Sequence, residues 1–271
     1  MKSVLITGAG GGIGRALVDV FTKAGWQVHA SERKGPGLTL DVTSDDSVRL
    51  AKELIGVPDV IINNAGLGLL APMAETSDEL LTRQFEVNVR GLARVTRAFV
   101  PDMVRRGHGR VINVGSLAGT FTLPWFGSYA ATKYAVEAMT DALRMECAPF
   151  GVNVSLIEPS VVGTGFVDTA MDSLRSAAGQ SAWRAPLLEA VRQQATFSLA
   201  QITPEQVAKV VFRAATARAP RARYRVGRLA SFVLRVASLL PTPVVDALLR
   251  SFTGLTPPSR SLPPPAEESH A

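Results

Sequence analysis

The sequence is poor in the residues that build disulfides and metal sites. Its 271 residues include a single cysteine, Cys147, so no disulfide can form within the chain and nothing indicates an oxidising compartment. The three histidines, His29, His108 and His270, are scattered, which argues against a histidine-based metal site. Charged residues make up 19% and apolar residues 46% of the chain, which is typical of a globular protein with a substantial core.

Targeting and membrane-spanning segments are also lacking. The first residues lead directly into a short apolar run and a glycine cluster, without the apolar h-region or cleavage site of a secretory signal. The apolar segment 229–252 is interrupted by Arg235, Pro241, Pro243 and Asp246, and so falls short of the ~20 apolar residues that a membrane span needs. We therefore expect a cytoplasmic protein.

The net charge of +6 has a local origin. Residues 206–245 contain eight basic and no acidic residues, whereas the rest of the chain contains 21 basic and 23 acidic residues. Together with the apolar segment, this stretch predicts either a peripheral contact of 218–253 with an anionic membrane surface or a subunit contact in a homodimer or homotetramer. No nucleic-acid-binding module accompanies the charge, so we expect no nucleic-acid partner.

Short β-branched runs alternate with longer helical patterns through the first two thirds of the chain. This alternation predicts a single-domain α/β fold, a doubly wound, Rossmann-like parallel sheet with helices on both faces. Strands are expected at 4–6, 27–31, 38–40, 59–62, 110–114 and 153–157. Helices are expected to begin at Thr43–Ser44, at a capping box of Thr76 with Glu79, and at a second box of Thr203 with Gln206.

The C-terminal third lacks this regular alternation of strand and helix patterns. We expect one catalytic domain over 1–255, in which about 164–202 is an irregular substrate lid and about 206–253 is the basic and apolar segment. Long irregular stretches in compact domains are often active-site lids. Residues 256–271, rich in proline and serine, are expected to be disordered.

A glycine cluster follows the first predicted strand. Thr7-Gly8-Ala9-Gly10-Gly11-Gly12-Ile13-Gly14 lies between a strand and a helix, where glycines let the backbone approach a pyrophosphate at the positive end of the helix. A glycine cluster alone would also fit a tight turn. Its position, however, coincides with other polar clusters at the carboxyl ends of the predicted strands, where such sheets bind ligands.

Tyr129 and Lys133 lie four residues apart on a predicted helix, so their side chains share one face. An ammonium group and the positive ring of an oxidised nicotinamide should lower the pKa of a tyrosine, which is ordinarily near 10. Tyr129 would then be the general base for alcohol oxidation and the general acid for carbonyl reduction. Ser116, after the fifth strand, would hold the substrate oxygen by a hydrogen bond.

The order of these motifs resembles the short-chain dehydrogenase/reductase family over about residues 3–165. The glycine cluster matches its T-G-x-x-x-G-x-G, residues 63–66 its N-N-A-G, and residues 129–133 its Y-x-x-x-K. The resemblance implies that Asn88, Ser116, Tyr129 and Lys133 are catalytic. It also implies that Lys133 binds the nicotinamide ribose and that Asn88 anchors a water leading from Lys133 to solvent.

The resemblance implies a nicotinamide cofactor, and Glu32 indicates NAD. An acidic residue at the end of the second strand can bind the ribose hydroxyls and repel a 2′-phosphate, whereas the adjacent Arg33 could pair with that phosphate and leaves NADP open. Asp41-Val42 resembles the family's adenine contact, although Asp41 could equally be a helix-start residue. The residues expected to bind the cofactor are Gly8, Gly10, Gly12, Ile13, Gly14, Glu32, Arg33, Asp41, Val42, Asn64, Ala65, Gly66, Tyr129, Lys133, Pro159, Val162 and Thr164.

One departure from the family pattern lies after the sixth strand, where Pro159-Ser160 replaces the usual Pro-Gly. The stretches 67–70 and 117–126 and the lid beginning at Phe166 are mostly apolar, which predicts a hydrophobic secondary alcohol or ketone, such as a steroid, retinoid, fatty or aromatic compound. A non-catalytic nucleotide sensor or scaffold of the same fold is the main alternative. An isomerase or dehydratase is a further one, although those relatives usually carry a larger substrate domain.

Overall fold

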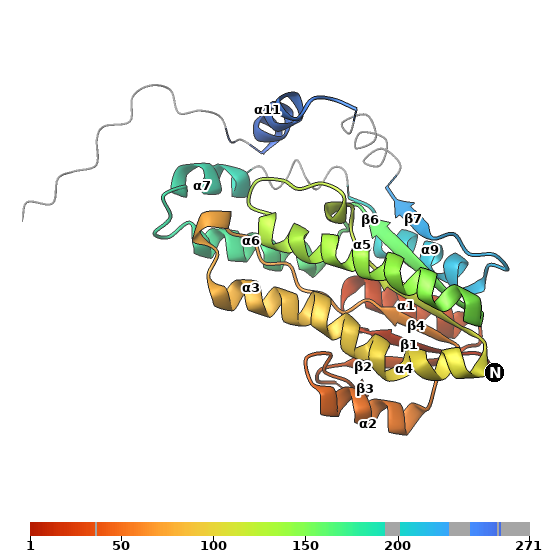
Figure 1. The fold of residues 1–271 in the computed structure, drawn as a ribbon. Coiled ribbons are helices and arrows are strands. Elements are labelled where there is room, and N and C mark those ends of the chain that lie inside the picture. Colours follow the sequence, from red (N-terminus) through yellow and green to blue (C-terminus); the bar gives the residue numbers. More distant parts are fainter. Residues whose placement is uncertain (36, 193–200, 228–238, 254, 256–271) are drawn as a thin grey trace, which may run out of the picture.

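One parallel sheet organises the chain, with strands in the order β3-β2-β1-β4-β5-β6-β7 (Figure 1). The computed structural model describes residues 1–35, 37–192, 201–227, 239–253 and 255. The strands are β1 (Ser3–Thr7), β2 (Gln27–Glu32), β3 (Leu38–Thr39), β4 (Val60–Asn63), β5 (Gly109–Val114), β6 (Val152–Pro159) and β7 (Arg223–Val226). The single-domain Rossmann-like prediction is therefore confirmed.

Helices cover both faces of the sheet (Figure 1). The longer ones are α1 (Gly12–Lys23), α2 (Asp45–Ile55), α3 (Asp78–Phe85), α4 (Leu92–Arg106), α5 (Gly127–Cys147), α6 (Gly165–Ala177), α7 (Arg184–Arg192), α9 (Pro204–Thr216) and α11 (Thr242–Phe252). Shorter turns are η1 (Met73–Glu75), η2 (Glu86–Gly91), η3 (Leu117–Gly119) and η4 (Ala148–Phe150).

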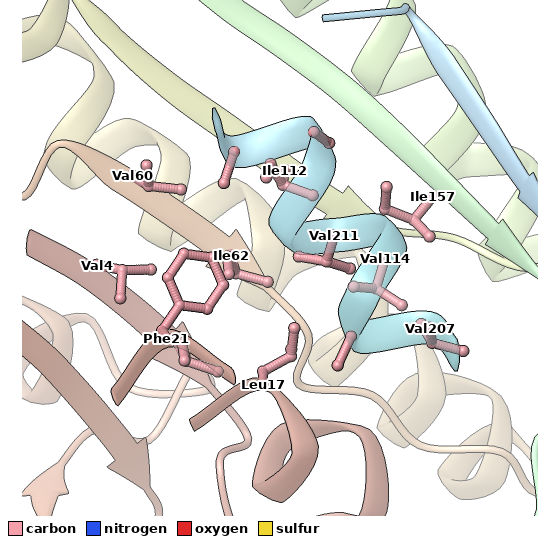
Figure 2. Close-up of a cluster of buried hydrophobic side chains, with 14 of the residues drawn as sticks. Val4, Leu17, Phe21, Val60, Ile62, Ile112, Val114, Ile157, Val207 and Val211 are labelled. Carbon is pink, nitrogen blue, oxygen red and sulfur yellow. The ribbon is translucent and has the colours of Figure 1, made fainter. Parts of the chain in front are cut away.

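The apolar strand runs are buried because both faces of the sheet are covered. On one face, α1 and α9 pack side by side over the central strands, and Figure 2 shows Val207 and Val211 of α9 among the same buried side chains as Ile157 and Val114. Phe21 of α1 is fully buried in this layer. The opposite face is covered by α2, α4 and the end of α5, where Cys147 is buried.

The order in which the strands are added to the sheet reverses at β1. The connections from β1 proceed through β2 to β3 on one side, and then return so that β4 pairs with β1 on the other. The loops after β1 and β4 therefore separate at the carboxyl edge of the sheet, and ligands of open α/β sheets bind in the crevice at such a point.

Two of the three predicted helix starts are confirmed. Ser44 caps α2 by accepting a hydrogen bond from the Ser47 amide, and Thr203 forms the expected capping box with Gln206. The box at Thr76 with Glu79 is wrong by one residue: the cap of α3 is Ser77, which accepts from the Leu80 amide. Thr76 instead donates its hydroxyl to the Pro72 carbonyl and closes the turn η1.

The lid prediction needs correction within the described residues. Residues 165–177 and 184–192 are the helices α6 and α7, rather than an irregular stretch. Their apolar side chains Met171, Leu174 and Leu187 are buried, so packing on the domain stabilises them. Residues 193–200 of the predicted lid lie outside the described residues.

The seventh strand, β7, lies beyond the strands that the sequence indicates. Its Arg-Tyr-Arg-Val sequence pairs in parallel with β6 and forms an edge of the sheet. Of the apolar segment 229–252, the structure describes α11 and the residues just before it, and Leu240, Val244 and Leu248 are exposed at four-residue spacing. No helix in the described ranges is long and apolar enough to span a membrane. Residues 256–271, predicted to be disordered, lie outside the described residues.

Candidate active site

The loop between β1 and α1 leads into a helix start that has no room for a side chain at Gly12 or Gly14. A Cβ atom on Gly14 would lie 2.2 Å from the Gly8 carbonyl oxygen, and one on Gly12 would lie 2.4 Å from Cγ2 of Thr164. Gly8 itself has a φ of 65°, in the left-handed region that glycine tolerates best. Bare backbone thus surrounds the start of α1, where N–H groups and the helix dipole favour an anion. The loop fits the pyrophosphate of a dinucleotide.

The loop after β4 supports the glycine loop from the side. The side-chain amide of Asn64 donates to the carbonyl oxygens of Thr7 and Gly8 at 3.0 and 3.1 Å. The backbone amides of Asn64 and Ala65 both donate to the Thr7 hydroxyl at 3.0 Å. These residues position the cradle; direct contact of Asn64, Ala65 and Gly66 with the cofactor stays a prediction.

Glu32 at the end of β2 extends over the glycine loop. A Cβ atom on Gly10 would lie 2.5 Å from a carboxylate oxygen of Glu32, so this side chain lies directly against the loop. Arg33 is exposed. The negative charge of Glu32 is therefore in contact with the glycine loop.

Asp41 and Val42 are engaged with neighbouring elements. One Asp41 carboxylate oxygen accepts hydrogen bonds from the amide and the hydroxyl of Thr43 at 2.9 and 2.7 Å, which fixes the turn before α2. Val42 is buried, and a Cβ atom on Gly91 would lie 2.8 Å from its side chain. The helix-start interpretation of Asp41 thus has direct support, and the adenine contact stays a prediction.

Tyr129 lies in the first turn of α5 and forms a hydrogen bond with Ser116, which follows β5. Burial raises the pKa of Tyr129 to about 12, and the hydrogen bond with Ser116 opposes this rise. The sequence predicts a lowered pKa for Tyr129. The difference arises because the desolvation of a buried phenolate is the larger effect among the protein groups.

Lys133 lies one turn further along α5, with its Nζ 5.8 Å from the centre of the Tyr129 ring. Its ammonium donates to the Val114 carbonyl at the end of β5, at 3.0 Å. Burial lowers the pKa of Lys133 to about 8. The structure thus brings the predicted Ser116, Tyr129 and Lys133 together at the carboxyl ends of the central strands.

Asn88 lies in η2, a π-helical turn that interrupts the path from α3 to α4. Its amide is almost fully used: Oδ1 accepts from the Leu67 amide at 2.7 Å, and Nδ2 donates to the Leu67 carbonyl and the Thr132 hydroxyl. A Cβ atom on Gly66 would lie 3.5 Å from Asn88 Oδ1 and 3.9 Å from Lys133 Nζ. Asn88 and Lys133 therefore both lie near Gly66, and the anchoring of a water by Asn88 stays a prediction. π-Helical turns such as η2 are frequent at functional sites.

Residues 159–164 run past the glycine loop. Thr164 caps α6 by accepting from the Phe166 amide, and its methyl group lies against Gly12. Val162 is buried and bridges to Ile202. The unusual Ser160 lies against Gly227, where a Cβ atom would come within 2.2 Å of the Ser160 hydroxyl oxygen. Ser160 thus contacts the turn after β7, and its departure from Pro-Gly leaves the strand end intact.

An apolar cluster surrounds Tyr129 on the substrate side. We call it the lid cluster; its buried members are Leu70, Trp125, Tyr129, Ala170, Met171, Leu174, Ala178, Leu187 and Ala190. The ring of Phe166 lies 5.6 Å from that of Tyr129 and directly over Gly68, yet 38% of Phe166 is exposed. The surroundings of Tyr129 are thus apolar, and the substrate pocket itself stays a prediction.

A group of charged residues that the sequence interpretation missed lies further along α5. Arg223 of β7 pairs with Glu137 at 3.1 Å and with Asp141 at 2.6 Å, and Arg225 approaches the fully buried Glu158 at 3.4 Å. Glu137 follows Lys133 by four residues, so it continues the face of Tyr129 and Lys133. Glu158 is a carboxylate within an apolar strand, which was the signal available in the sequence.

This charged group predicts a pH dependence of stability. Burial and the nearby Glu158 raise the pKa of Glu137 to about 7, whereas an unfolded glutamate titrates near 4.5. The folded state therefore holds this proton at pH values where the unfolded state has lost it. Stability from this group is complete below pH ~4.5 and is lost as the pH rises towards 7. Between pH 5 and 8 the melting temperature of Glu137→Gln should therefore fall less than that of the wild type.

Asp141→Asn is the matched control, because folding lowers the pKa of Asp141 whereas it raises the pKa of Glu137. Arg223 holds the pKa of Asp141 below its usual value, so the stability that Asp141 contributes is lost as the pH falls. Asp141→Asn should keep the wild-type decline between pH 5 and 8 and soften the decline below pH ~4. Identical pH profiles of Glu137→Gln and the wild type would contradict the assignment.

Comparison with known proteins identifies relatives over most of the chain. A family profile described as short chain dehydrogenase matches residues 2–175. The uncharacterized oxidoreductase YbbO of Escherichia coli is 34% identical over 265 residues, covering 92% of this chain and 94% of its own. Human 17-beta-hydroxysteroid dehydrogenase type 1 is 34% identical over 249 residues, covering 82% of this chain and 76% of its own.

Solved structures agree with this similarity. A short-chain dehydrogenase/reductase from Burkholderia phymatum, in complex with NAD, has a TM-score of 0.75 at 26% identity and covers 88% of this chain and 93% of its own. A short-chain dehydrogenase from Burkholderia cenocepacia, in complex with NADP, has a TM-score of 0.72 at 25% identity and covers 95% of this chain and all of its own. Both forms of the cofactor thus occur among similar structures.

Proposed function

The chain belongs to the short-chain dehydrogenase/reductase family, and from this we propose that it transfers a hydride between NAD and a lipophilic secondary alcohol or ketone. It is an oxidoreductase that uses a nicotinamide cofactor. The observation that carries the finer proposal is the assembly of Ser116, Tyr129 and Lys133 under the apolar lid cluster.

Tyr129 transfers the proton in the proposed reaction. It donates its phenolic proton to the carbonyl oxygen in reduction and removes the hydroxyl proton in oxidation, while Ser116 stabilises the charge on that oxygen. Lys133, a donor beside the phenol, favours the phenolate form. When bound, the nicotinamide supplies or accepts the hydride, and its oxidised form adds a positive charge that favours the phenolate further.

The lid cluster supports the substrate class. Leucine, methionine and aromatic side chains gather around Tyr129, and a substrate held among them would have a carbon skeleton rather than a charge, because burying a charge there would cost much more than burying apolar surface. The name of the human relative, a hydroxysteroid dehydrogenase, points to the same class.

A panel of lipophilic alcohols and ketones, each tested with NAD(H) and NADP(H), examines the proposal directly. The absorbance of the reduced nicotinamide reports turnover in both directions. Turnover with NAD(H) should appear among the steroid, retinoid, fatty or aromatic compounds, whereas small charged hydroxy acids should show none. Turnover confined to charged metabolites would contradict the proposed substrate class.

Glu32 should determine the cofactor preference. Its carboxylate lies against Gly10, where it would repel the 2′-phosphate of NADP and accept hydrogen bonds from the ribose hydroxyls of NAD. We expect the wild type to prefer NAD, and Glu32→Ala to reduce the ratio of kcat/KM for NAD over NADP by at least about tenfold, which is ~1.4 kcal/mol.

The control for this prediction is Glu53→Ala. Glu53 is an exposed residue of α2 that pairs with Arg49, so it tests the effect of removing a carboxylate elsewhere. It should leave the cofactor ratio unchanged. An unchanged ratio in Glu32→Ala as well would contradict the NAD assignment.

A further inference from the structure

Trp125 lies immediately before α5, one turn ahead of Tyr129. It is a buried member of the lid cluster, with only 7% of its surface exposed. Phe126 and Trp183 pack against the same cluster. The indole of Trp125 is therefore held in the same apolar cluster as the ring of Tyr129.

The indole N–H of Trp125 is buried and donates to no acceptor among the residues that the structure describes. Buried polar groups in folded proteins nearly always have a partner, and an unsatisfied donor costs free energy. Since the other members of the cluster are largely apolar, the neighbouring side chains cannot easily supply the missing acceptor.

The backbone of Trp125 is also unusual. Its φ of 73° is the positive value of a left-handed conformation, which a bulky side chain rarely adopts. The surroundings enforce it: the Trp125 carbonyl accepts from the Ala71 amide at 3.2 Å, and the next amide, of Phe126, donates to the Leu123 carbonyl at 3.1 Å. Such strain concentrates at functional sites, where the fold holds one side chain in a required place.

We propose that Trp125 determines substrate specificity, by donating its indole N–H to a second, neutral oxygen on the lipophilic alcohol or ketone. The inference rests on the proposed function, because it assumes that the reacting oxygen meets Tyr129. An indole nitrogen only donates hydrogen bonds, so the second group must be an acceptor such as a carbonyl, hydroxyl or ether oxygen. The apolar cluster disfavours a carboxylate in that place.

Trp125→Phe removes the N–H while keeping an aromatic ring and a Cβ atom at the strained position. The probes are 5α-androstane-3,17-dione, which has a second oxygen, and 5α-androstan-17-one, which lacks it. Reduction at C17 by NADH is quantified for both, so the same carbonyl is compared. The wild type should favour the dione in kcat/KM by at least about tenfold, because a donor built into a pocket discriminates against the analogue without an acceptor. In Trp125→Phe the ratio should fall to about one.

Trp183→Phe is the matched control, because it changes another indole on the edge of the same cluster. It should keep the wild-type ratio. Equal turnover of the two steroids by the wild type, or an unchanged ratio in Trp125→Phe, would overturn the inference about Trp125 while leaving the reaction in place. Turnover of neither steroid, and of none of the other lipophilic compounds, would instead contradict the proposed substrate class, and with it the premise of the inference. Where another lipophilic ketone reacts in place of the steroids, the same ratio is measured on that ketone with and without a second oxygen.

Discussion

Tyr129→Phe should lower kcat/KM by about a thousandfold in both directions, since a positioned general acid or base contributes roughly 10²- to 10⁴-fold. The variant removes the phenolic oxygen and its hydrogen bond with Ser116, while the ring can keep its packing in the lid cluster. Steady-state rates of NAD reduction and NADH oxidation measure the effect. The affinity for NADH, followed by its fluorescence, should change far less than turnover.

Tyr134→Phe separates the loss of a reacting group from the loss of any hydroxyl on α5. Tyr134 lies on the same helix, but 47% of its surface is exposed. Its removal should leave both rates near those of the wild type. If Tyr129→Phe turned over substrate as fast as Tyr134→Phe, the proton-transfer role of Tyr129 would have to be abandoned.

Gly14→Ala should abolish most cofactor binding. Its new methyl group would lie 2.2 Å from the Gly8 carbonyl oxygen and 2.7 Å from the Ala9 Cα atom, both of which are backbone and cannot rotate away. The loop has to move, so its backbone no longer follows the pyrophosphate. We expect the Kd for NADH to rise at least about a hundredfold, which is ~2.7 kcal/mol, and the melting temperature to fall.

Gly11→Ala offers a control within the same loop. A Cβ atom there would meet only the Gly8 carbonyl oxygen, at an ordinary 3.5 Å, and Gly11 has a φ of −76° that alanine adopts readily. It should bind NADH nearly as well as the wild type. Equal Kd values for the two alanine variants would show that the close packing at Gly14 does not shape the cradle.

The sequence predicted best what is local or what repeats a known order. The glycine loop and Ser116 each follow a strand of a parallel sheet, and Tyr129 and Lys133 lie in the first turns of the helix after β5. They converge because that topology brings these segments to one edge of the sheet, and the topology can be predicted from alternating runs. The caps of α2 and α9 follow from side chains three residues from their partners. At α3 both Thr76 and Ser77 are suitable capping residues, but the Thr76 hydroxyl donates to the Pro72 carbonyl, and Ser77 caps the helix.

The features missed depend on contacts between distant residues. β7 is a strand because β6 pairs with it, and its own alternation of arginine with an apolar residue spans only four residues. The helices α6 and α7 gain their stability from packing on the lid cluster, which local composition does not reveal. The raised pKa of Tyr129 depends on the depth of its burial, which the four-residue spacing to Lys133 does not encode.

The hydrogen bonds of Thr7 and Asn64 also determine when the loops after β1 and β4 lose their conformational entropy, because these bonds form as the chain folds. The Thr7 hydroxyl accepts two backbone amides from the loop after β4, and Asn64 returns two hydrogen bonds to the glycine loop. These hydrogen bonds hold the two loops together in the folded protein. A dinucleotide meets a preorganised surface, so binding restricts the ligand rather than the protein, and more of the contact energy remains as affinity.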